Sequence, residues 1–313
     1  MRKTLKKYYK KTQEYVWKVG FVQNSLDEIL DGAPLNVKWV SGEPPGVWWA
    51  DPFILDANER ELVLLVEEFP FATRRGTIVR LTIDRATLQV VHRAVVLSLN
   101  THLSFPAIYR SPNGNIYVYP ENWKSGSLKV WRYDTDAQKL TEPHVVCTLP
   151  LTDAIFTSLL GFPMLASTRK PSASSPRLDF YRPSFADDGL QWVESEMVFC
   201  GSHLFDRRVA RSAGDWFEHR GKIYRPAMES EIEYGHAVVL QEVSVEQVSA
   251  PASADAFPRL LFKDVRTLFS PDSEYERGLH TFNVYKDTIV IDVKGYRYPV
   301  FGRLMRKIRN LMG

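Results

Sequence analysis

Residues Asp51–Val66 read DPFILDANERELVLLV: an acidic residue, an apolar run, a short polar turn and a second apolar run. Two apolar runs joined by a polar turn predict an antiparallel hairpin. The pattern returns at residues 104–119, 153–165, 211–224 and 280–292. A unit that recurs every roughly 50 to 70 residues and carries several strands is typical of the blades of a β-propeller. The sequence therefore predicts an all-β fold, a five-bladed β-propeller.

Further strands fill each repeat. Apolar or alternating segments follow the hairpins at residues 77–83, 90–97, 128–133, 177–181 and 236–243. Each repeat then supplies about four strands, which is the content of one blade. The Ser-, Ala- and Pro-rich stretches 172–176 and 249–258 are expected to be loops. Because no linker divides the body, we assign one propeller to residues 23–298.

The two ends of the chain differ in charge from the body. Residues 1–12 and residues 294–313 each hold six basic residues and no acidic residue. Since the whole chain carries a net charge of only +3, the body is acidic, which argues against general nucleic-acid binding. We predict a basic helical segment at residues 1–22. Residues 299–313 are predicted to form a basic amphipathic helix, with an apolar stripe from Val300 to Met312.

Two interpretations of these ends stay open. Basic amphipathic helices bind anionic membrane surfaces. Alternatively, each helix docks on the propeller and exposes a solvated charged face. The termini of a closed propeller usually lie close together, so the two basic ends would form one patch, which favours the membrane interpretation.

Composition and motifs limit the class of protein. A hydrophobic content of 44% and a charged content of 25% are those of a soluble globular protein, and no stretch has the length and apolarity of a membrane span or a signal peptide. The two cysteines, Cys147 and Cys200, give neither a disulfide framework nor metal-ligand spacing. Phosphate-loop, dinucleotide and zinc-protease motifs are missing from the sequence. We therefore expect a cytoplasmic protein, peripheral at the inner face of the membrane if its ends bind lipid, with no cofactor and no metal.

The repeats also align the residues expected at the channel. In a propeller the innermost strand of each blade begins at the channel mouth. The residues in these places are Asp51, Asp153, Arg211 and His280, with His102 and Ser104 in the second repeat. Glycosidic-bond cleavage needs two carboxyl groups about 5–9.5 Å apart, and Asp51 with Asp153 is the candidate catalytic pair. The structural alternative is that Asp51 organises its Asp-Pro turn.

Several of these motifs, in this order, resemble one family. They are Trp49–Phe53, His102–Pro106 with Tyr119–Glu121, Thr152–Ala154, Ala210–Gly214 with Tyr224–Ala227, Glu233–Gly235 and His280–Asn283. The sequence is similar to the propeller domain at the N-terminus of plant glucosamine inositolphosphorylceramide transferases and to its stand-alone bacterial relatives. More distantly, it resembles the five-bladed propellers of glycoside hydrolase families 43 and 32.

This resemblance implies work on carbohydrate, in glycolipid or surface-polysaccharide assembly. In the hydrolase propellers a base Asp opens the first blade, an assisting Asp opens the third and an acid Glu opens the fourth. Asp51 and Asp153 match the first two, but Arg211 stands where the acid should be. Glu121 is therefore the candidate acid, with Glu229, Glu231 and Glu233 as alternatives. The structural alternative for each glutamate is a solvent-facing carboxylate at a strand end.

The arginines indicate a second chemistry. Arginine binds carboxylate or phosphate in a bidentate manner. Arg211 and Arg225, with His102 and His280, would suit an anionic sugar or a lipid-linked phosphate; Ser104, Tyr234 and Asn283 complete the candidate binding set. The structural alternative is an Arg211–Asp153 pair that joins two blades. The tryptophans Trp48, Trp49 and Trp123 are either platforms for sugar rings or core residues.

Two functions follow from these expectations. The first is an enzyme that transfers or hydrolyses a sugar with Asp51, Asp153 and Glu121. The second is a non-catalytic module that binds a glycan and serves a partner glycosyltransferase. The missing acid in the fourth repeat favours binding or transfer over hydrolysis, whereas the Asp pair favours catalysis.

Overall fold

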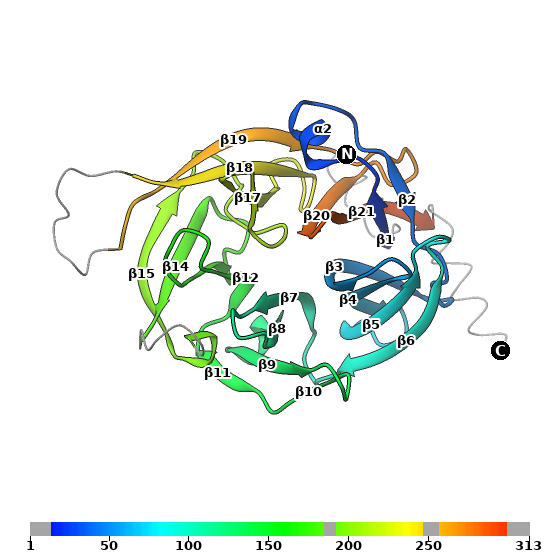
Figure 1. Cartoon of the computed structure of the whole chain (residues 1–313), viewed down its shortest axis with the longest axis horizontal. Helices are drawn as coiled ribbons and strands as arrows, with labels where there is room; N and C mark the ends of the chain where they lie inside the picture. The colour runs from blue at the N-terminus through cyan, green and yellow to red at the C-terminus, as the bar shows by residue number, and fades with distance from the viewer. Residues whose placement is uncertain (1–13, 185–191, 247–256, 299–313) are drawn as a thin grey trace, which may run out of the picture.

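The computed structural model describes residues 14–184, 192–246 and 257–298. Five antiparallel sheets surround a central axis, with β3, β7, β12 and β20 among the strands nearest to it (Figure 1). The predicted five-bladed propeller is therefore confirmed. Each sheet is one blade, and its strands follow one another from the axis to the rim.

The first four blades are continuous in sequence. Blade 1 contains β3 (Val47–Ala57), β4 (Glu61–Pro70), β5 (Thr77–Asp84) and β6 (Val90–Leu97). Blade 2 contains β7 (Ser104–Arg110), β8 (Ile116–Glu121), β9 (Leu128–Asp134), β10 (Lys139–Leu140) and β11 (His144–Cys147). Blade 3 contains β12 (Leu151–Thr157), β13 (Met164–Arg169), β14 (Arg177–Pro183) and β15 (Met197–Leu204). Blade 4 contains β16 (Phe217–His219), β17 (Lys222–Glu229), β18 (Ala237–Val245) and β19 (Leu260–Leu268).

Blade 5 closes the ring with both ends of the described chain. Its strands are β20 (Gly278–Tyr285), β21 (Thr288–Tyr298), β1 (Glu14–Val22) and β2 (Val37–Trp39), in that order from the axis. The strand β1 pairs antiparallel with β21 and buries Val16, Val19 and Phe21. Within the described residues the propeller therefore includes Glu14–Val22, and this part of the segment predicted to be helical at residues 1–22 is a strand. Residues 1–13 and the predicted helix at 299–313 lie outside the described residues.

The short helices are connections. They are α2 (Leu26–Leu30), η1 (Trp123–Ser125) and η2 (Trp192–Glu194). Ser25 begins α2 with a capping box, in which the Ser25 side chain accepts from the Glu28 amide and the Glu28 side chain accepts from the Ser25 amide. In the described ranges, every helix is too short or too polar to cross a membrane.

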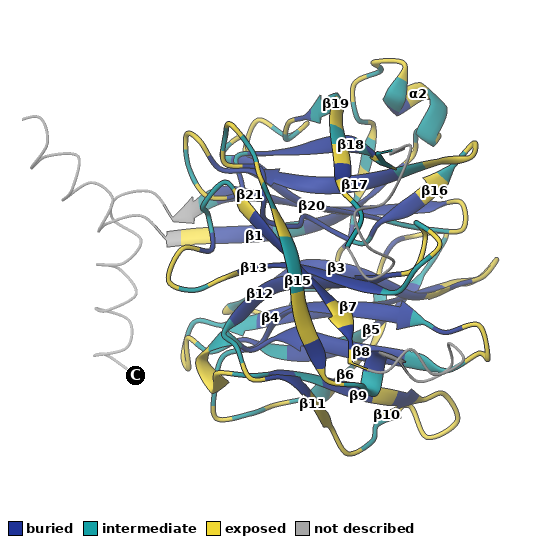
Figure 2. Ribbon diagram, turned by 90° about the vertical axis from the view of Figure 1, so that its left-hand side faces the viewer, coloured by how far each residue is buried: buried dark blue, intermediate teal, exposed yellow. Residues whose placement is uncertain are grey.

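Burial falls from the axis to the rim of each blade. All seven residues of β12 are buried, whereas none of the eight residues of the outer strand β6 is buried. Inner strands pack on both faces against neighbouring blades and therefore show continuous apolar runs. Figure 2 shows the buried strands stacked inside the molecule and the exposed residues on hairpins and edge strands.

The inner strands share a distortion near their first residues. The register of the inner strand shifts between Ala50 and Phe53, between Ser104 and Pro106, and between Thr152 and Ile155. At these bulges Asp51, Phe105 and Asp153 have positive φ angles of 50°, 45° and 46°. Asp tolerates the left-handed region better than Phe does. The distortion turns backbone N–H groups toward the neighbouring blade, and this arrangement shapes the candidate site.

Candidate functional site

A cavity of about 310 Å³ lies at the channel mouth, where the inner strands begin. Seven of the ten predicted site residues line it: Asp51, His102, Ser104, Glu121, Arg211, Tyr234 and His280. Its wall also contains Glu67, Lys170 and Ser174, and the aromatic residues Trp17, Trp48, Phe69 and Trp123. The structure thus brings together residues from all five blades.

Carboxylates of one blade hold the bulge of the next blade. The Asp51 amide donates to Asp292 Oδ2 at 2.8 Å, and the Phe105 amide donates to Asp51 Oδ2 at 2.9 Å. The Asp153 amide donates to Glu121 Oε2 at 3.1 Å. Each bond satisfies a backbone donor that the bulge removes from its own sheet. These carboxylates therefore stabilise the ring as well as line its channel.

His280 joins one cluster of the site. Its Nδ1 lies 3.1 Å from Asp292 Oδ2 and 3.1 Å from Asp51 Oδ1, and its Nε2 lies 2.7 Å from the Tyr234 hydroxyl. Burial disfavours the charged ring, yet the Tyr234 oxygen and the Asp292 and Asp51 carboxylates raise the pKa of His280 well above its usual value. The imidazolium therefore bridges two carboxylates at neutral pH.

The same cluster has the residue types of a cation site. One ligand atom from each of Asp51, His280 and Asp292 lies within 4.8 Å of the others. A cation bound there would have to replace the proton on His280 Nδ1, because that nitrogen faces both carboxylates. The geometry is already satisfied by the protonated ring.

Arg211 joins the second cluster. Its Nε donates to Asp153 Oδ2, and its Nη2 donates to Asp153 Oδ1 at 3.1 Å and to Glu121 Oε2 at 2.9 Å. Burial raises the pKa of Asp153, but Arg211 outweighs it and holds that pKa below its usual value. Burial raises the pKa of Glu121 well above its usual value against the opposing effect of Arg211. The Arg211–Asp153 pair between blades, which was the structural alternative, is present.

Glu67 is a site residue that sequence reasoning missed. Glu67 lies in β4, three residues before its last residue, Pro70. Its carboxyl group is buried, with Oε1 at 3.5 Å from His102 Nε2. Burial, followed by the nearby Asp51 carboxylate, raises the pKa of Glu67 well above its usual value. Among the described residues, Glu67 Oε1 and Asp51 Oδ1 accept no hydrogen bond from an N–H or O–H group. A proton on Glu67 would satisfy both oxygens, because a protonated acid donates to an adjacent carboxylate.

Strand register shows how Glu67 could have been found. Glu67 pairs with Ala50, the residue before Asp51, and Glu121 pairs with Ser104, the residue before Phe105. The two glutamates therefore occupy the same place in blades 1 and 2. Aligning the ends of the second strands, rather than the starts of the first strands alone, reveals this equivalence.

His102 is neutral in this setting. Its Nδ1 accepts from the Gly76 amide at 2.9 Å. Burial and the Lys124 charge lower the pKa of His102 to about 4. His102 is therefore neutral in its contact with Glu67 at neutral pH.

The tryptophans divide between core and cavity. Trp49 is fully buried and donates from Nε1 to Glu68 Oε2 at 3.0 Å, so it is a core residue. Trp48 stacks on Phe69 with ring centroids 4.6 Å apart and an angle of 9° between the rings. The Lys170 ammonium lies 5.0 Å from the centre of the half-buried Trp123 ring. Trp48 and Trp123 are thus placed at the cavity, as a platform for a ligand requires.

Three predicted residues do not line the cavity. Asp153 lies beneath it, 2% exposed and held by Arg211. The Arg225 guanidinium is fully buried in blade 4, where it donates to Gln241 Oε1 at 2.7 Å and to the carbonyls of Val209 and Ala210. Burial lowers the pKa of Arg225 to about 9.

Asn283 also has a structural position. Its Nδ2 donates to the Pro52 carbonyl at 2.9 Å, and its Oδ1 accepts from the Asp215 amide at 2.8 Å. Asn283 therefore links blade 5 to blades 1 and 4. The alternative acids Glu229, Glu231 and Glu233 also lie outside the cavity wall: Glu229 and Glu231 bind backbone amides, and Glu233 lies beside Lys294.

The sequence and the fold match known proteins. The family described as "Glucosamine inositolphosphorylceramide transferase 1, N-terminal" matches residues 38–252, which is more than half of the chain. A comparison with curated proteins gives no match. Among solved structures, the β-xylosidase RS223 is similar at 10% identity and a TM-score of 0.50, over 72% of this chain and 79% of that chain. An α-L-arabinofuranosidase from Clostridium thermocellum has 13% identity and a TM-score of 0.44, over 71% of this chain and 74% of that chain. At these identities the likeness to the xylosidase shows the fold.

Proposed function

Because the chain belongs to the family of the glucosamine inositolphosphorylceramide transferase 1 N-terminal domain, we propose that it is a carbohydrate-related propeller whose central cavity binds a glycan. The observation that carries the proposal is the cavity wall, where aromatic faces stand beside buried polar groups. A module of this kind would hold its glycan for a partner glycosyltransferase.

The wall has the chemistry that sugars require. Sugar rings pack their C–H faces on aromatic rings. Trp17, Trp48 and Trp123 line the cavity, and Trp123 is the most exposed of the three. Sugar hydroxyls need fixed donors and acceptors, which Ser104 and Tyr234 provide among others. The volume of about 310 Å³ is that of a small-ligand pocket, whose usual range is roughly 300–1,000 Å³.

The geometry favours binding over hydrolysis by the predicted Asp pair. A general base needs a lone pair that faces the substrate. Asp51 Oδ2 accepts from the Phe105 amide, and Asp51 Oδ1 faces the buried His280 ring at 3.1 Å. Both oxygens of Asp153 accept from Arg211. The two aspartates that open blades 1 and 3 therefore have a structural task in the closed ring.

Acid-assisted glycosyl chemistry is the second candidate function. Glu67 supports it, because this residue is a buried acid at the cavity wall with a pKa raised well above its usual value by burial and by Asp51. A protonated glutamate is what protonates a leaving sugar oxygen. Arg211 stands where the acid of the fourth blade was expected, and on this proposal Glu67, from the second strand of the first blade, takes its place.

Tryptophan fluorescence tests the binding proposal. The protein is titrated with a panel of monosaccharides that includes glucosamine, and the affinity is compared with that of Trp123→Ala. We expect the Trp123→Ala variant to bind the best sugar roughly five- to tenfold more weakly, because it loses one aromatic face. Trp39→Ala is the matched control, since Trp39 is also half-buried and also contacts a lysine ammonium, but lies in the outer strand β2. Equal affinity in all three proteins, or no binding to any sugar, would contradict the proposal.

Glu67→Gln separates binding from catalysis. Glutamine has the same shape and still donates to Asp51, but it has no proton to transfer. We incubate the wild type with lipid-linked and nucleotide sugars and follow product formation. If the protein is an enzyme of this type, turnover falls at least a hundredfold in Glu67→Gln while sugar affinity is kept. Turnover that survives in Glu67→Gln and is lost in Glu121→Gln would move the acid to blade 2.

A further inference from the structure

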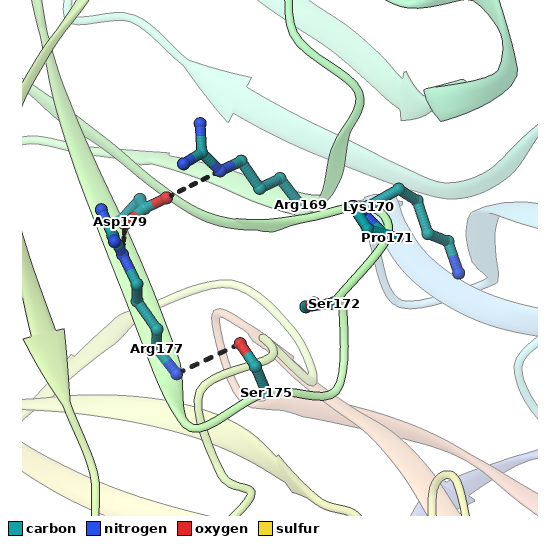
Figure 3. A pocket seen from close by; sticks show the side chains of 7 residues that line it. All are labelled: Arg169, Lys170, Pro171, Ser172, Ser175, Arg177 and Asp179. Atoms are coloured by element: carbon teal, nitrogen blue, oxygen red, sulfur yellow. Dashed lines mark hydrogen bonds and ion pairs between the residues drawn. The ribbon is translucent and has the colours of Figure 1, made fainter.

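A second cavity, of about 280 Å³, lies beside the channel mouth on blade 3 (Figure 3). It is enclosed by the end of β13, the start of β14 and the loop of residues 170–176 between them. Its polar lining consists of Arg169, Lys170, Ser172, Ser175, Arg177 and Asp179. An adjoining hollow of about 430 Å³ shares the loop and adds Arg208.

We call this cavity and the adjoining hollow together the basic pocket. Its lining carries an excess of positive charge. The carboxylate of the pocket is that of Asp179, whose side chain is 3% exposed. Arg169 Nε lies 3.5 Å from Asp179 Oδ2, and Arg177 Nε lies 2.6 Å from Asp179 Oδ1. The two guanidinium groups flank Asp179 and share one negative charge (Figure 3). Each arginine side chain is 46% exposed, so its terminal NH groups remain available to a ligand.

Two further cations lie on the same loop and beside it. Within the described ranges, neither the Lys170 ammonium nor the Arg208 guanidinium pairs with a carboxylate. Lys170 lies over the Trp123 ring at 5.0 Å, and Figure 3 shows its side chain extending away from the two arginines. Ser172 and Ser175 line both hollows with Lys170, and Arg208 lines the adjoining one. Guanidinium, ammonium and hydroxyl donors around one hollow are the set that binds a phosphoryl group.

The basic pocket and the central cavity share a wall. Lys170 lines both, and Ser174 lines the central cavity and the adjoining hollow. In the central cavity the charge of Arg211 is already matched by Asp153, so Arg211 offers little to an anion there. We propose that the basic pocket binds the phosphoryl group of a phosphorylated glycan whose sugar occupies the central cavity. This inference rests on the proposed function for the sugar and on the basic pocket itself for the phosphate.

Inorganic pyrophosphate tests the pocket without any sugar. Binding to the full chain is measured by isothermal titration calorimetry at low salt, for the wild type and for Lys170→Gln/Arg208→Gln. These two side chains lack carboxylate partners among the described residues, so their loss should not disturb the blade. We expect at least a tenfold loss of pyrophosphate affinity in the double variant, about the value of one charge-assisted hydrogen bond. Arg60→Gln is the matched control, because Arg60 is an exposed arginine on the hairpin at the far end of blade 1.

Glucose and glucose 1-phosphate then connect the two cavities. Glucose 1-phosphate should bind the wild type at least tenfold more tightly than glucose does. The two ligands should bind Lys170→Gln/Arg208→Gln with equal affinity. Vesicles of phosphatidylcholine with phosphatidic acid distinguish a lipid phosphate, because their flotation with the protein would then be lost in the same variant. If Lys170→Gln/Arg208→Gln still floats with these vesicles, the phosphate bound by the pocket belongs to a soluble sugar.

The outcomes separate the two proposals. Pyrophosphate binding that depends on Lys170 and Arg208, with no sugar bound anywhere, supports the basic pocket and overturns the glycan site. Sugar binding with no pyrophosphate binding, or with pyrophosphate binding unchanged in the double variant, overturns the basic pocket.

Discussion

Replacing Arg211 by methionine should strongly destabilise the propeller. Arg211 joins blade 4 to Asp153 in blade 3 and to Glu121 in blade 2. The side chains of Arg211, Asp153 and Glu121 are 8%, 2% and 5% exposed. Without the guanidinium, the Asp153 carboxylate stays buried without its cation, and breaking a buried pair in this way costs about 3–5 kcal/mol.

A double-mutant cycle isolates the pair. Asp153→Asn removes the charge and keeps the size, and Asn tolerates the left-handed backbone that Asp153 adopts with a φ of 46°. Arg211→Met/Asp153→Asn should therefore lose less stability than the sum of the single variants, with a coupling energy on the order of 2 kcal/mol. The matched control is Arg207→Met, because the Arg207–Asp264 pair is 33% and 44% exposed and should contribute less than about 1 kcal/mol.

Urea unfolding followed by tryptophan fluorescence and by far-UV circular dichroism measures these values. Coincident transitions in the two signals are required before free energies are compared. The pH dependence supplies a second readout. Burial raises the pKa of Asp153, but Arg211 lowers it below the ordinary value of 3.8, so the stability from this pair is present above that pH and is lost as the pH falls. A loss of stability below about 1 kcal/mol in Arg211→Met, or strictly additive variants, would refute this reasoning.

Three further predictions use other parts of the ring. Burial opposes charge on His280, but Tyr234, Asp292 and Asp51 raise the pKa of this ring. Burial and the Lys124 charge lower the pKa of His102 to about 4. Imidazole ¹H–¹⁵N spectra at pH 7 should therefore show a protonated His280 and a neutral His102. The stability linked to His280 is complete below its ordinary pKa of 6.5 and is lost as the pH rises through the raised value; a neutral His280 at pH 7 would contradict the bridging imidazolium. Arg225→Met should lower the free energy of unfolding by about 2–4 kcal/mol, because it leaves Gln241 and two buried carbonyls without their donor. Sugar affinity should stay unchanged. Weaker sugar binding by the folded variant would show that Arg225 belongs to the site. Gln138→Gly should raise the free energy of unfolding by about 1 kcal/mol, since exposed Gln138 has a φ of 53°, with Gln138→Ala as the control that gains nothing.

The five blades could be predicted because inner strands are buried on both faces and leave continuous apolar runs in the sequence. The closing strand β1 could not. Residues Glu14–Val22 pair with Thr288–Tyr298 at the opposite end of the chain, and a pairing so distant leaves no local pattern. The basic residues before it also favoured a different interpretation of the N-terminus.

The site could be predicted where it depends on the first inner strand. Asp51, His102, Ser104 and His280 lie at those strand starts and line the cavity. Glu67 was missed because it lies on the second strand, opposite Ala50, where its proximity to Asp51 depends on the bulge. Arg225 was assigned to the site because arginine binds carboxylate and phosphate, but the direction of a side chain in a buried strand depends on register, which the sequence does not show.

The channel carboxylates bind backbone amides of the next blade and are also candidate functional groups, and this limits which variants can reveal function. Asp51 accepts the Phe105 amide that the bulge of blade 2 exposes, and Asp292 accepts the Asp51 amide in the same way. Removing the carboxylate of Asp51 or of Asp292 would disturb the contacts between blades and would also remove a candidate catalytic group. Lost activity in such variants would therefore have two explanations. Glu67 holds no backbone amide among the described residues, and the polar groups beside it are the Asp51 carboxylate and His102 Nε2. Glu67→Gln therefore alters the acid and preserves the ring, which makes this residue, rather than the aspartates that open the blades, the one at which catalysis and binding can be told apart.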